Sequence, residues 1–538
     1  MKNIFISLVV MGLLFTSCSD FLEEDVRSNV VAEEYYETSA GYESLINANY
    51  SMLSDIYGKE PWTFCAGTDM YSDGRTQQPV GISRYLTLSA GTPEIEPLYE
   101  NAFSAIQIAN MGLYYNEITD YSDDLEQYKG ELKYLRANAY FLLVQTYGGV
   151  SLVTDYINSP ILSFSRNSED EIYSFIISEL EESLDLVSEG AYTGRVNRRA
   201  VEHLLAKVLL TRGYEVYGNE NDFSQAAAYA DAAIAGESLS IPFGELWSPD
   251  NEMNSETIFS VQYSQSIIST DPEELGNMQS YFFGSYLGGP EVAGSAPSRS
   301  YNLIATDYTI DLYEEGDDRW EGTFMTEIFE NYYDFYNVQE KDHDELSVSD
   351  YYAPKWKSSV KDSISYVIAH PGAVYHKYGT YGANINVNAD AESISARKFD
   401  DPDQQFSNKG TSTRDIVLSR LGETYLIASE AYYKSGNLGT ALARLNEVRN
   451  RANVAALSEI DIDVILDERA RELFGEYHRW FDLKRTGTLV ERTAKYNSQV
   501  NESYFSGNAG NLKILRPIPQ SAIDLNQNPE FSQNPAYN

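Results

Sequence analysis

The chain has 538 residues, 43% of them hydrophobic and 22% charged, which is typical of a globular protein with a large core. Its formal net charge is −42, from 39 lysines and arginines against 81 aspartates and glutamates. A surface this acidic repels phosphate backbones, so the charge argues against nucleic acid as a partner. It is compatible with sugars, cationic peptides and basic protein surfaces.

The first residues have the pattern of a bacterial export signal. Lys2 precedes the apolar run 4–15, which is too short to span a bilayer, and small residues at 16–17 precede Cys18. This pattern resembles a lipobox. It predicts a signal peptide over residues 1–17 and lipid attachment at Cys18, with a plain secretory signal as the alternative.

Residues 18–32 are predicted to form a lipidated tether, because they open on an acidic stretch that is solvated and does not pack. A diacylglycerol group and an amide-linked acyl chain on one cysteine give an effectively permanent membrane anchor. If Cys18 is acylated, Cys65 has no disulfide partner, and no site built from several cysteines is available.

Helical periodicity dominates from residue 33 onward, with apolar and small residues recurring every three or four positions. Residues 125–147 predict one long helix with a buried face. Residues 168–187 predict a second, whose first turn has the Ser168 capping box. Residues 200–236 predict two more helices, with alanines that allow close helix pairing.

Residues 425–452 have small residues and a Gly436 turn at tetratricopeptide spacing, and residues 132–187 and 201–235 are looser versions. Stacked helix pairs of this kind form a superhelix. The sequence therefore predicts an all-α fold, a tetratricopeptide-like helical-repeat superhelix with long irregular loop insertions. We expect residues 33–538 to form a single domain.

Two irregular regions interrupt the helical pattern, residues 58–97 and the longer stretch 264–413, which is rich in glycine, tyrosine, aspartate and serine. Long loops within a compact protein commonly carry function on a rigid scaffold. Sugars stack on aromatic rings and form hydrogen bonds with polar side chains at the rim of a site. The glycan-binding candidates on these loops are Trp62, Asp69, Tyr71, Asp73, Arg75, Tyr85, Tyr281, Tyr286 and Trp320, whereas Trp247, Trp356 and Trp480 are assigned to the core.

Motifs for catalysis or metal binding are missing from the sequence. None of the five histidines forms a zinc motif, and no nucleophile elbow, dinucleotide fingerprint or phosphate loop occurs. We therefore predict no enzyme activity, no metal and no cofactor. Residues 400–403 contain three aspartates that would suit calcium, but a solvated loop is the favoured interpretation.

One charged cluster has the residue types of an active site but the spacing of a helical ion-pair network. We interpret it as structural; its members are Glu468, Arg469, Glu472, Arg479, Trp480 and Asp482.

Five segments, in this order, resemble the SusD/RagB family of glycan-uptake lipoproteins across nearly all of the mature chain. These segments are residues 131–148, 254–259, 420–452, 467–485 and 516–537. The resemblance implies a surface lipoprotein, anchored in the outer membrane, that binds oligosaccharides and delivers them to a TonB-dependent SusC-like transporter. The alternatives are a peptide-binding RagB-like protein, a helical-repeat scaffold for other proteins and, as a third class, a surface glycosidase.

Overall fold

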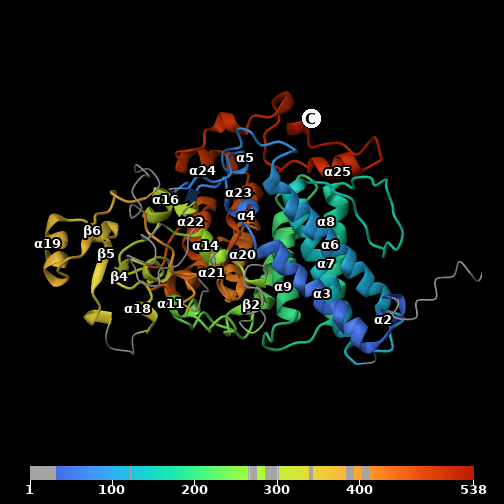
Figure 1. Ribbon diagram of the computed structural model, residues 1–538, viewed down its shortest axis with the longest axis horizontal. Helices are drawn as coiled ribbons and strands as arrows, with labels where there is room; N and C mark the ends of the chain where they lie inside the picture. Colours follow the sequence, from blue (N-terminus) through green and yellow to red (C-terminus); the bar gives the residue numbers. More distant parts are fainter. Residues whose placement is uncertain are drawn as a thin grey trace, which may run out of the picture.

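The computed structural model describes residues 32–538, except 75, 122, 265, 267–274, 285–299, 301, 338–342, 383–392 and 403–410. The predicted signal peptide, Cys18 and nearly all of the predicted tether lie outside the described residues. The described chain is mostly helical, and Figure 1 shows its helices stacked side by side, with the loop region and a small sheet at the other end of the long axis.

The first half of the chain forms an array of antiparallel helices, in which α7 packs between α6 and α8, and α9 packs against α8 and α10. These elements and the short helices between them are α2 Ala32–Glu37, α3 Ser39–Tyr57, α4 Trp62–Cys65, α5 Val80–Arg84, α6 Glu96–Asn116, α7 Leu125–Tyr147, α8 Glu169–Leu186, α9 Arg198–Arg212, α10 Asp222–Ile234 and α11 Phe243–Leu246.

Helix α7 has the bounds that its sequence pattern predicts and ends at Gly148, whose φ of 74° is a left-handed conformation that favours glycine. Helix α8 begins at the predicted capping box, in which Ser168 accepts the backbone N–H of Glu171 and the Glu171 side chain accepts the N–H of Ser168. Local sequence therefore sets both boundaries.

The predicted tetratricopeptide unit is confirmed as the helix pair α20 Leu421–Lys434 and α21 Leu438–Arg451, which turns at Gly436 with φ 84°. The Ser429 hydroxyl donates to the Ala441 carbonyl oxygen at 2.8 Å and ties the two helices together. Helix α10 packs on both α9 and α20. Its buried alanines allow these close approaches, as the sequence predicts.

The middle of the chain holds more regular structure than the predicted loops. Three small sheets occur in the described residues: β1 Tyr71–Ser72 with β3 Ile304–Ala305, β2 Thr257–Val261 with β7 Ile416–Arg420, and β4 Glu327–Phe329, β5 Val348–Tyr352 and β6 Val374–His376. Its helices are α14 Gln279–Phe282, α16 Asp307–Asp311, α17 Arg319–Thr323, α18 Asp334–Asn337, η3 His343–Glu345, η4 Lys355–Lys357 and α19 Val360–Ala369.

The antiparallel pair β2–β7 closes the long irregular region at its base, because β2 lies just before residue 264 and β7 just after residue 413. The region is thus an insertion whose two ends meet. The chain then continues through α20 and α21 to α22 Ile462–Glu472, α23 Arg479–Arg485, α24 Leu489–Tyr496 and α25 Gln520–Leu525, and the remaining 3₁₀ turns are η2 Pro93–Ile95, η5 Glu502–Phe505, η6 Asn508–Gly510 and η7 Pro535–Tyr537.

One large hydrophobic core, containing residues from Leu53 to Phe531, joins the helical array to the loop region. Inside it lies a set of paired charges that we call the buried ion cluster. Its members include Arg319, Lys398, Arg420, Arg449, Arg451, Glu468, Arg469, Glu472, Glu476 and Asp482, all buried. The structural interpretation of the charges at 468–482 is therefore confirmed.

Glu472 is the centre of this cluster. Its carboxylate accepts Arg420 Nη1 at 2.6 Å and Arg319 Nη1 at 3.3 Å, and it also pairs with Arg451. Burial alone would raise the pKa of Glu472, but Arg451, Arg420 and Arg319 hold that pKa well below its ordinary value. The carboxylate is ionised in the folded protein, and three cations depend on it.

We expect Glu472→Ala to lower the free energy of unfolding by about 3–5 kcal/mol, because it leaves buried arginines without their shared anion. The matched control is Glu117→Ala, which breaks the exposed pair with Lys129 at 2.8 Å and is expected to cost under about 1 kcal/mol. Urea unfolding followed by circular dichroism measures both. Equal losses in the two variants would contradict a structural role for the cluster.

Candidate functional site

The two irregular regions predicted to carry the binding site meet in the folded protein. Strand β1 pairs antiparallel with β3, with Tyr71 opposite Ala305 and Ser72 opposite Ile304. The chain leaving β1 and the chain entering β3 therefore lie at the same edge. We call this edge the β1–β3 rim and define it as residues 73–77 and 300–303, of which 75 and 301 lie outside the described residues.

Hydrogen bonds fix the polar groups at the β1–β3 rim. The Asp73 carboxylate accepts Arg84 Nη2 at 2.5 Å and the Gln78 backbone N–H at 2.9 Å. The Asp73 backbone N–H donates to Gln499 Oε1 at 3.1 Å. Burial raises the pKa of Asp73, and the bonds from Gln78 and Arg84 oppose that shift. The rim is thus polar and held in one geometry.

Tyr281 is joined to the β1–β3 rim by its backbone. Its carbonyl oxygen accepts the Ser300 backbone N–H at 2.8 Å, and the Ser300 hydroxyl donates to Asn302 Oδ1 at 2.5 Å. Tyr281 is half-buried, so among the nominated rings of the described residues it is the one that is partly exposed.

Four nominated rings do not form a surface platform, and the prediction that they face solvent is wrong. Trp62, Tyr71, Tyr85 and Trp320 are 5%, 2%, 0% and 3% exposed. The reason is packing against aromatic partners, which lie far away in the sequence for the first three rings and in the same loop region for Trp320. The ring-centroid distances are 4.9 Å from Trp62 to Phe282, 5.3 Å from Tyr71 to Phe474, 3.9 Å from Tyr85 to Phe505 and 5.6 Å from Trp320 to Tyr313.

Two nominated carboxylates, Asp69 and Asp73, are buried as well. Asp69 accepts Arg479 Nη2 at 2.6 Å and Arg492 Nε at 3.2 Å, so its lone pairs serve to tie the first loop to the C-terminal helices. The expectation of a free ligand-binding carboxylate at Asp69 is wrong. The Asp73 carboxylate is bound by Arg84, but Asp73 is part of the β1–β3 rim.

Arg75 and Tyr286 lie outside the described residues, so their assignment to the site stays a prediction. Of the three tryptophans assigned to the core, Trp247 and Trp480 are buried. Trp356 is half-buried, and its ring centroid lies 5.9 Å from that of Trp320.

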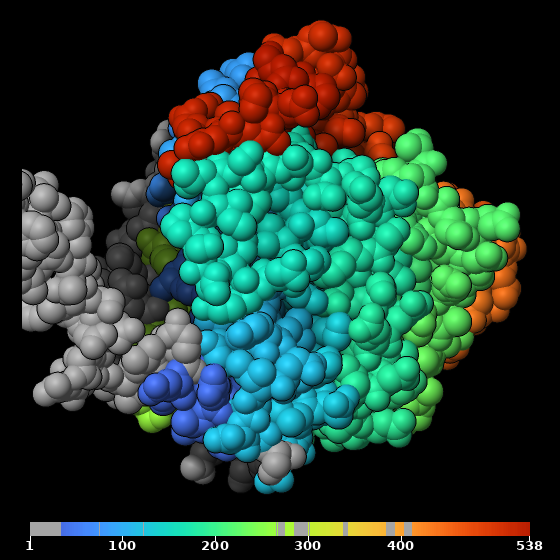
Figure 2. All heavy atoms as spheres, turned by 90° about the vertical axis from the view of Figure 1, so that its right-hand side faces the viewer, coloured from blue at the N-terminus to red at the C-terminus, as the bar shows by residue number. Residues whose placement is uncertain are grey.

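A groove that sequence reasoning missed lies between α6, residues 151–164 and α25, with a volume of about 700 Å³. Figure 2 shows the C-terminal segment, in red, lying against the teal region that precedes and includes α8. Rings of Tyr99, Phe103, Phe164 and Phe531 line the groove. No sequence signal marks it, because its walls come from segments that are far apart along the chain.

The groove has few polar groups to offer a sugar. The Gln107 amide donates to the Ile157 carbonyl oxygen at 2.9 Å, and the Asn526 amide donates to the Phe164 carbonyl oxygen at 3.0 Å. These amides are already used within the protein. An apolar surface with committed amides fits a sugar poorly, since hydroxyl groups lose water without gaining partners.

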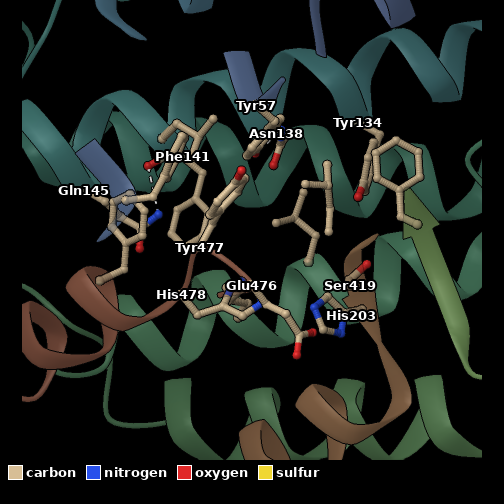
Figure 3. A pocket seen from close by; sticks show the side chains of 17 residues that line it. Tyr57, Tyr134, Asn138, Phe141, Gln145, His203, Ser419, Glu476, Tyr477 and His478 are labelled. Carbon is tan, nitrogen blue, oxygen red and sulfur yellow. Dashed lines mark hydrogen bonds between the residues drawn. The ribbon is translucent and has the colours of Figure 1, made fainter. Parts of the chain in front are cut away.

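A second hollow, of about 60 Å³, lies between α7, α9 and the segment before α23 (Figure 3). Asn138 and Gln145 line its upper wall, and His203 and His478 line the lower one. This volume admits one or two water molecules but not a sugar ring. The cavity is therefore too small to be a ligand site for a glycan.

Within the described residues, no group of three or more histidines, cysteines, aspartates or glutamates is arranged to hold a metal ion. Asp400 and Asp401 are 1% and 3% exposed, so the interpretation of these two as a solvated loop is wrong. The Asp400 carboxylate accepts the Tyr332 hydroxyl at 2.6 Å, and Asp401 accepts the Ser412 hydroxyl at 2.7 Å.

No helix in the described part of the chain has the length and hydropathy needed to cross a membrane.

The fold and the rim together define a helical-repeat protein whose loops carry a polar, prearranged edge. Its sequence matches the SusD family over residues 255–537, and a second family, described as starch-binding and associating with the outer membrane, over residues 20–210. The first match spans more than half of the chain. The protein therefore belongs to the SusD family, as the segment order predicts.

Relatives and solved structures agree with this assignment. A SusD-like protein of Bacteroides ovatus is 24% identical and is aligned over 90% of this chain and 82% of its own. The starch-binding protein SusD of Bacteroides thetaiotaomicron is 25% identical over 78% of this chain and 77% of its own. The fold is similar to that of a laminarin-binding SusD-like protein, with a TM-score of 0.70, 21% identity and coverage of 93% and 100%.

Acid should destabilise the protein through His478. Burial lowers the pKa of His478 to about 3, although Glu423 acts in the opposite direction. The unfolded histidine has a pKa of about 6.5. The unfolded chain thus binds more protons between these values, so the contribution of His478 to stability is complete above about pH 6.5 and is lost as the pH falls.

We expect the free energy of unfolding to fall between pH 7 and 5, and His478→Gln to reduce that slope by up to about 1.4 kcal/mol per pH unit. Asp415, whose pKa burial raises to about 6, acts with the opposite sign and provides the control. Asp415→Asn should steepen the acid loss of stability. Urea titrations at fixed pH measure both slopes, and an unchanged slope in His478→Gln would contradict a neutral buried ring.

Proposed function

We propose that this protein is a surface glycan-binding protein of the outer membrane, which captures oligosaccharides at the β1–β3 rim and delivers them to a TonB-dependent SusC-like transporter. The observation that carries the proposal is membership of the SusD family, together with relatives described as starch-binding and laminarin-binding. In this proposal Cys18 carries the lipid anchor and the chain catalyses no reaction.

The physical chemistry of the rim supports a sugar ligand. Glycan hydroxyl groups need fixed hydrogen-bonding partners, and the Arg84 guanidinium, which Asp73 holds in place and whose side chain is 26% exposed, offers donors beside the rim. The half-buried ring of Tyr281 suits the apolar face of a sugar. The groove beside α25 is too apolar to bind a sugar, and the cavity beside His203 is too small to hold one.

Arg75 and Tyr286 belong to this proposal because of their sequence positions. Arg75 follows β1 by three residues, and Tyr286 lies on the chain that leads from α14 to β3. We propose that Arg75 donates to sugar hydroxyls and that Tyr286 provides a second stacking face.

Alanine substitution at the rim should weaken glycan binding. We expect Tyr281→Ala, Tyr286→Ala and Arg75→Ala each to raise the Kd for the bound oligosaccharide about tenfold, since each removes about 1.4 kcal/mol of contact. Calorimetric titration against panels of glycans and peptides measures the effect. The matched control is Tyr114→Ala, an exposed tyrosine on α6, which should leave the Kd unchanged.

Unchanged affinity in all three rim variants would remove the rim from the proposal. Binding of peptides in place of glycans would favour a peptide-uptake protein. Release of reducing ends from a polysaccharide by the purified protein would contradict the absence of catalysis.

The anchor is tested separately by Cys18→Ala. Without acylation the exported protein should move from the outer-membrane fraction to the soluble fraction, because a lipid anchor supplies most of its membrane affinity. Cell fractionation with an antibody to the folded part measures this. Metabolic labelling with a radioactive fatty acid should mark the parent and not the variant. A variant that stays in the membrane fraction would contradict anchoring through this residue.

A further inference from the structure

Helix α19 carries an apolar face that is turned to solvent. Val360, Ile364, Val367 and Ile368 follow one another at intervals of four, three and one, so they share one side of the helix. They are 73%, 56%, 39% and 73% exposed, and Val374 on the adjoining strand β6 is 53% exposed. We call these five side chains the α19 ridge. An exposed apolar patch on a soluble domain marks a contact surface.

Contacts on the inner side of α19 fix the helix so that the ridge faces solvent. On the inner side of α19, the Tyr366 ring stacks on Tyr351 at 3.9 Å and its hydroxyl donates to Glu327 at 2.6 Å. A capping box formed by Ser359 and Asp362 fixes the start of the helix. The apolar face is thus presented by an anchored helix, not by a frayed one.

Lysines flank the ridge. Residues 355–377 contain four lysines against one aspartate, and the four lysines, at positions 355, 357, 361 and 377, are exposed. Acidic residues also occur on the adjoining strands, and two of them, Glu327 and Asp350, are bound by the Tyr366 hydroxyl at 2.6 Å and by His376 at 2.7 Å. Figure 1 places α19 at one extreme of the longest axis.

We propose that the α19 ridge inserts into the headgroup layer of an anionic lipid surface and forms a second membrane contact. Apolar side chains on one face of a helix, with lysines at its flanks, are the pattern of helices that lie in a membrane interface. Each lysine near an anionic surface adds attraction. This inference rests on the proposed attachment to the outer membrane, although its test needs no lipid on the protein.

Two other occupants fit the ridge less well. A second copy of this chain would bring its own flanking lysines against those of the first, and these like charges oppose a contact between two ridges. An acidic protein would need a groove that matches a convex helix, whereas lipid headgroups adapt to its shape. Both remain distinguishable outcomes of the experiment.

A second contact has a geometric consequence. Helix α2, the first described element after the predicted tether, lies at the opposite end of the long axis from α19 in Figure 1. Attachment at both ends lays this axis along the membrane. The ridge then binds at the high effective concentration that the anchor provides, so even a weak contact fixes the orientation.

The test uses the mature chain with Cys18→Ala, so that membrane binding depends on the folded part alone. Flotation is compared with vesicles of phosphatidylcholine and phosphatidylglycerol in equal parts and with vesicles of phosphatidylcholine only. We expect binding to the anionic vesicles, at least tenfold weaker binding to the neutral ones, and loss of binding in high salt. The double variant Ile364→Asn, Ile368→Asn should reduce the anionic binding at least tenfold.

Two further variants complete the design. Lys357→Glu with Lys361→Glu should abolish the preference for anionic vesicles, and Val216→Asn, at a fully exposed valine elsewhere, should change nothing. All substituted side chains are exposed, so melting temperatures should equal that of the parent. The glycan Kd should also be unchanged, which separates failure of this inference from failure of the proposed function.

The proposal is overturned if the parent does not bind anionic vesicles, or if the ridge variant binds as well as Val216→Asn. It is also overturned if analytical ultracentrifugation finds a dimer that the ridge variant abolishes. Binding to immobilised poly-glutamate without binding to vesicles would assign the ridge to an acidic protein surface instead.

Discussion

Glu472 joins three separate segments of the chain in the protein interior through their arginines. Arg319 comes from the loop region, Arg420 from β7 and Arg451 from the repeat helix α21, and all three share this carboxylate. Removing a guanidinium from water is costly, and only a nearby anion offsets the cost. The helical array and the loop region therefore form one polar core and depend on each other, although they differ in regularity and in sequence pattern.

The position of the β1–β3 rim, the proposed binding site, depends on that core. Asp69 pairs with Arg479 and Arg492, and the Tyr71 hydroxyl accepts the Gly475 backbone N–H at 2.7 Å, so this part of the first loop is tied to the C-terminal part of the chain. Asp69 and Tyr71, which the sequence nominates as binding residues, instead hold the first loop in place. A loop held in this way keeps its polar groups in place before any ligand arrives, which lowers the entropy lost on binding.

Sequence periodicity predicted the helices well, because the bounds of α7, the Ser168 cap and the α20–α21 pair depend on neighbouring residues. That the charges at 468–482 form ion pairs was also predictable, but most of their partners were not. Glu468–Arg471 and Asp482–Arg485 pair at a spacing of three, whereas Glu472 pairs with arginines from distant segments. The exposure of loop rings was not predictable. Tyr85 is covered by Phe505 and Trp62 by Phe282, and nothing near either residue in the chain signals those partners. The sheet β4–β5–β6 was missed because its short strands mix polar and apolar residues.

The closure of the insertion by β2 and β7 bears on how such proteins diversify. Because the two strands meet at its base, the distance between the ends of residues 264–413 is the same whatever the insertion contains. The free energy of closing a loop rises only slowly with its length. Additions and deletions in the exposed loops of the insertion thus transmit little strain to the helices, provided that the buried contacts of Arg319 and Lys398 are kept. The exposed loops can therefore vary while the helices keep their register.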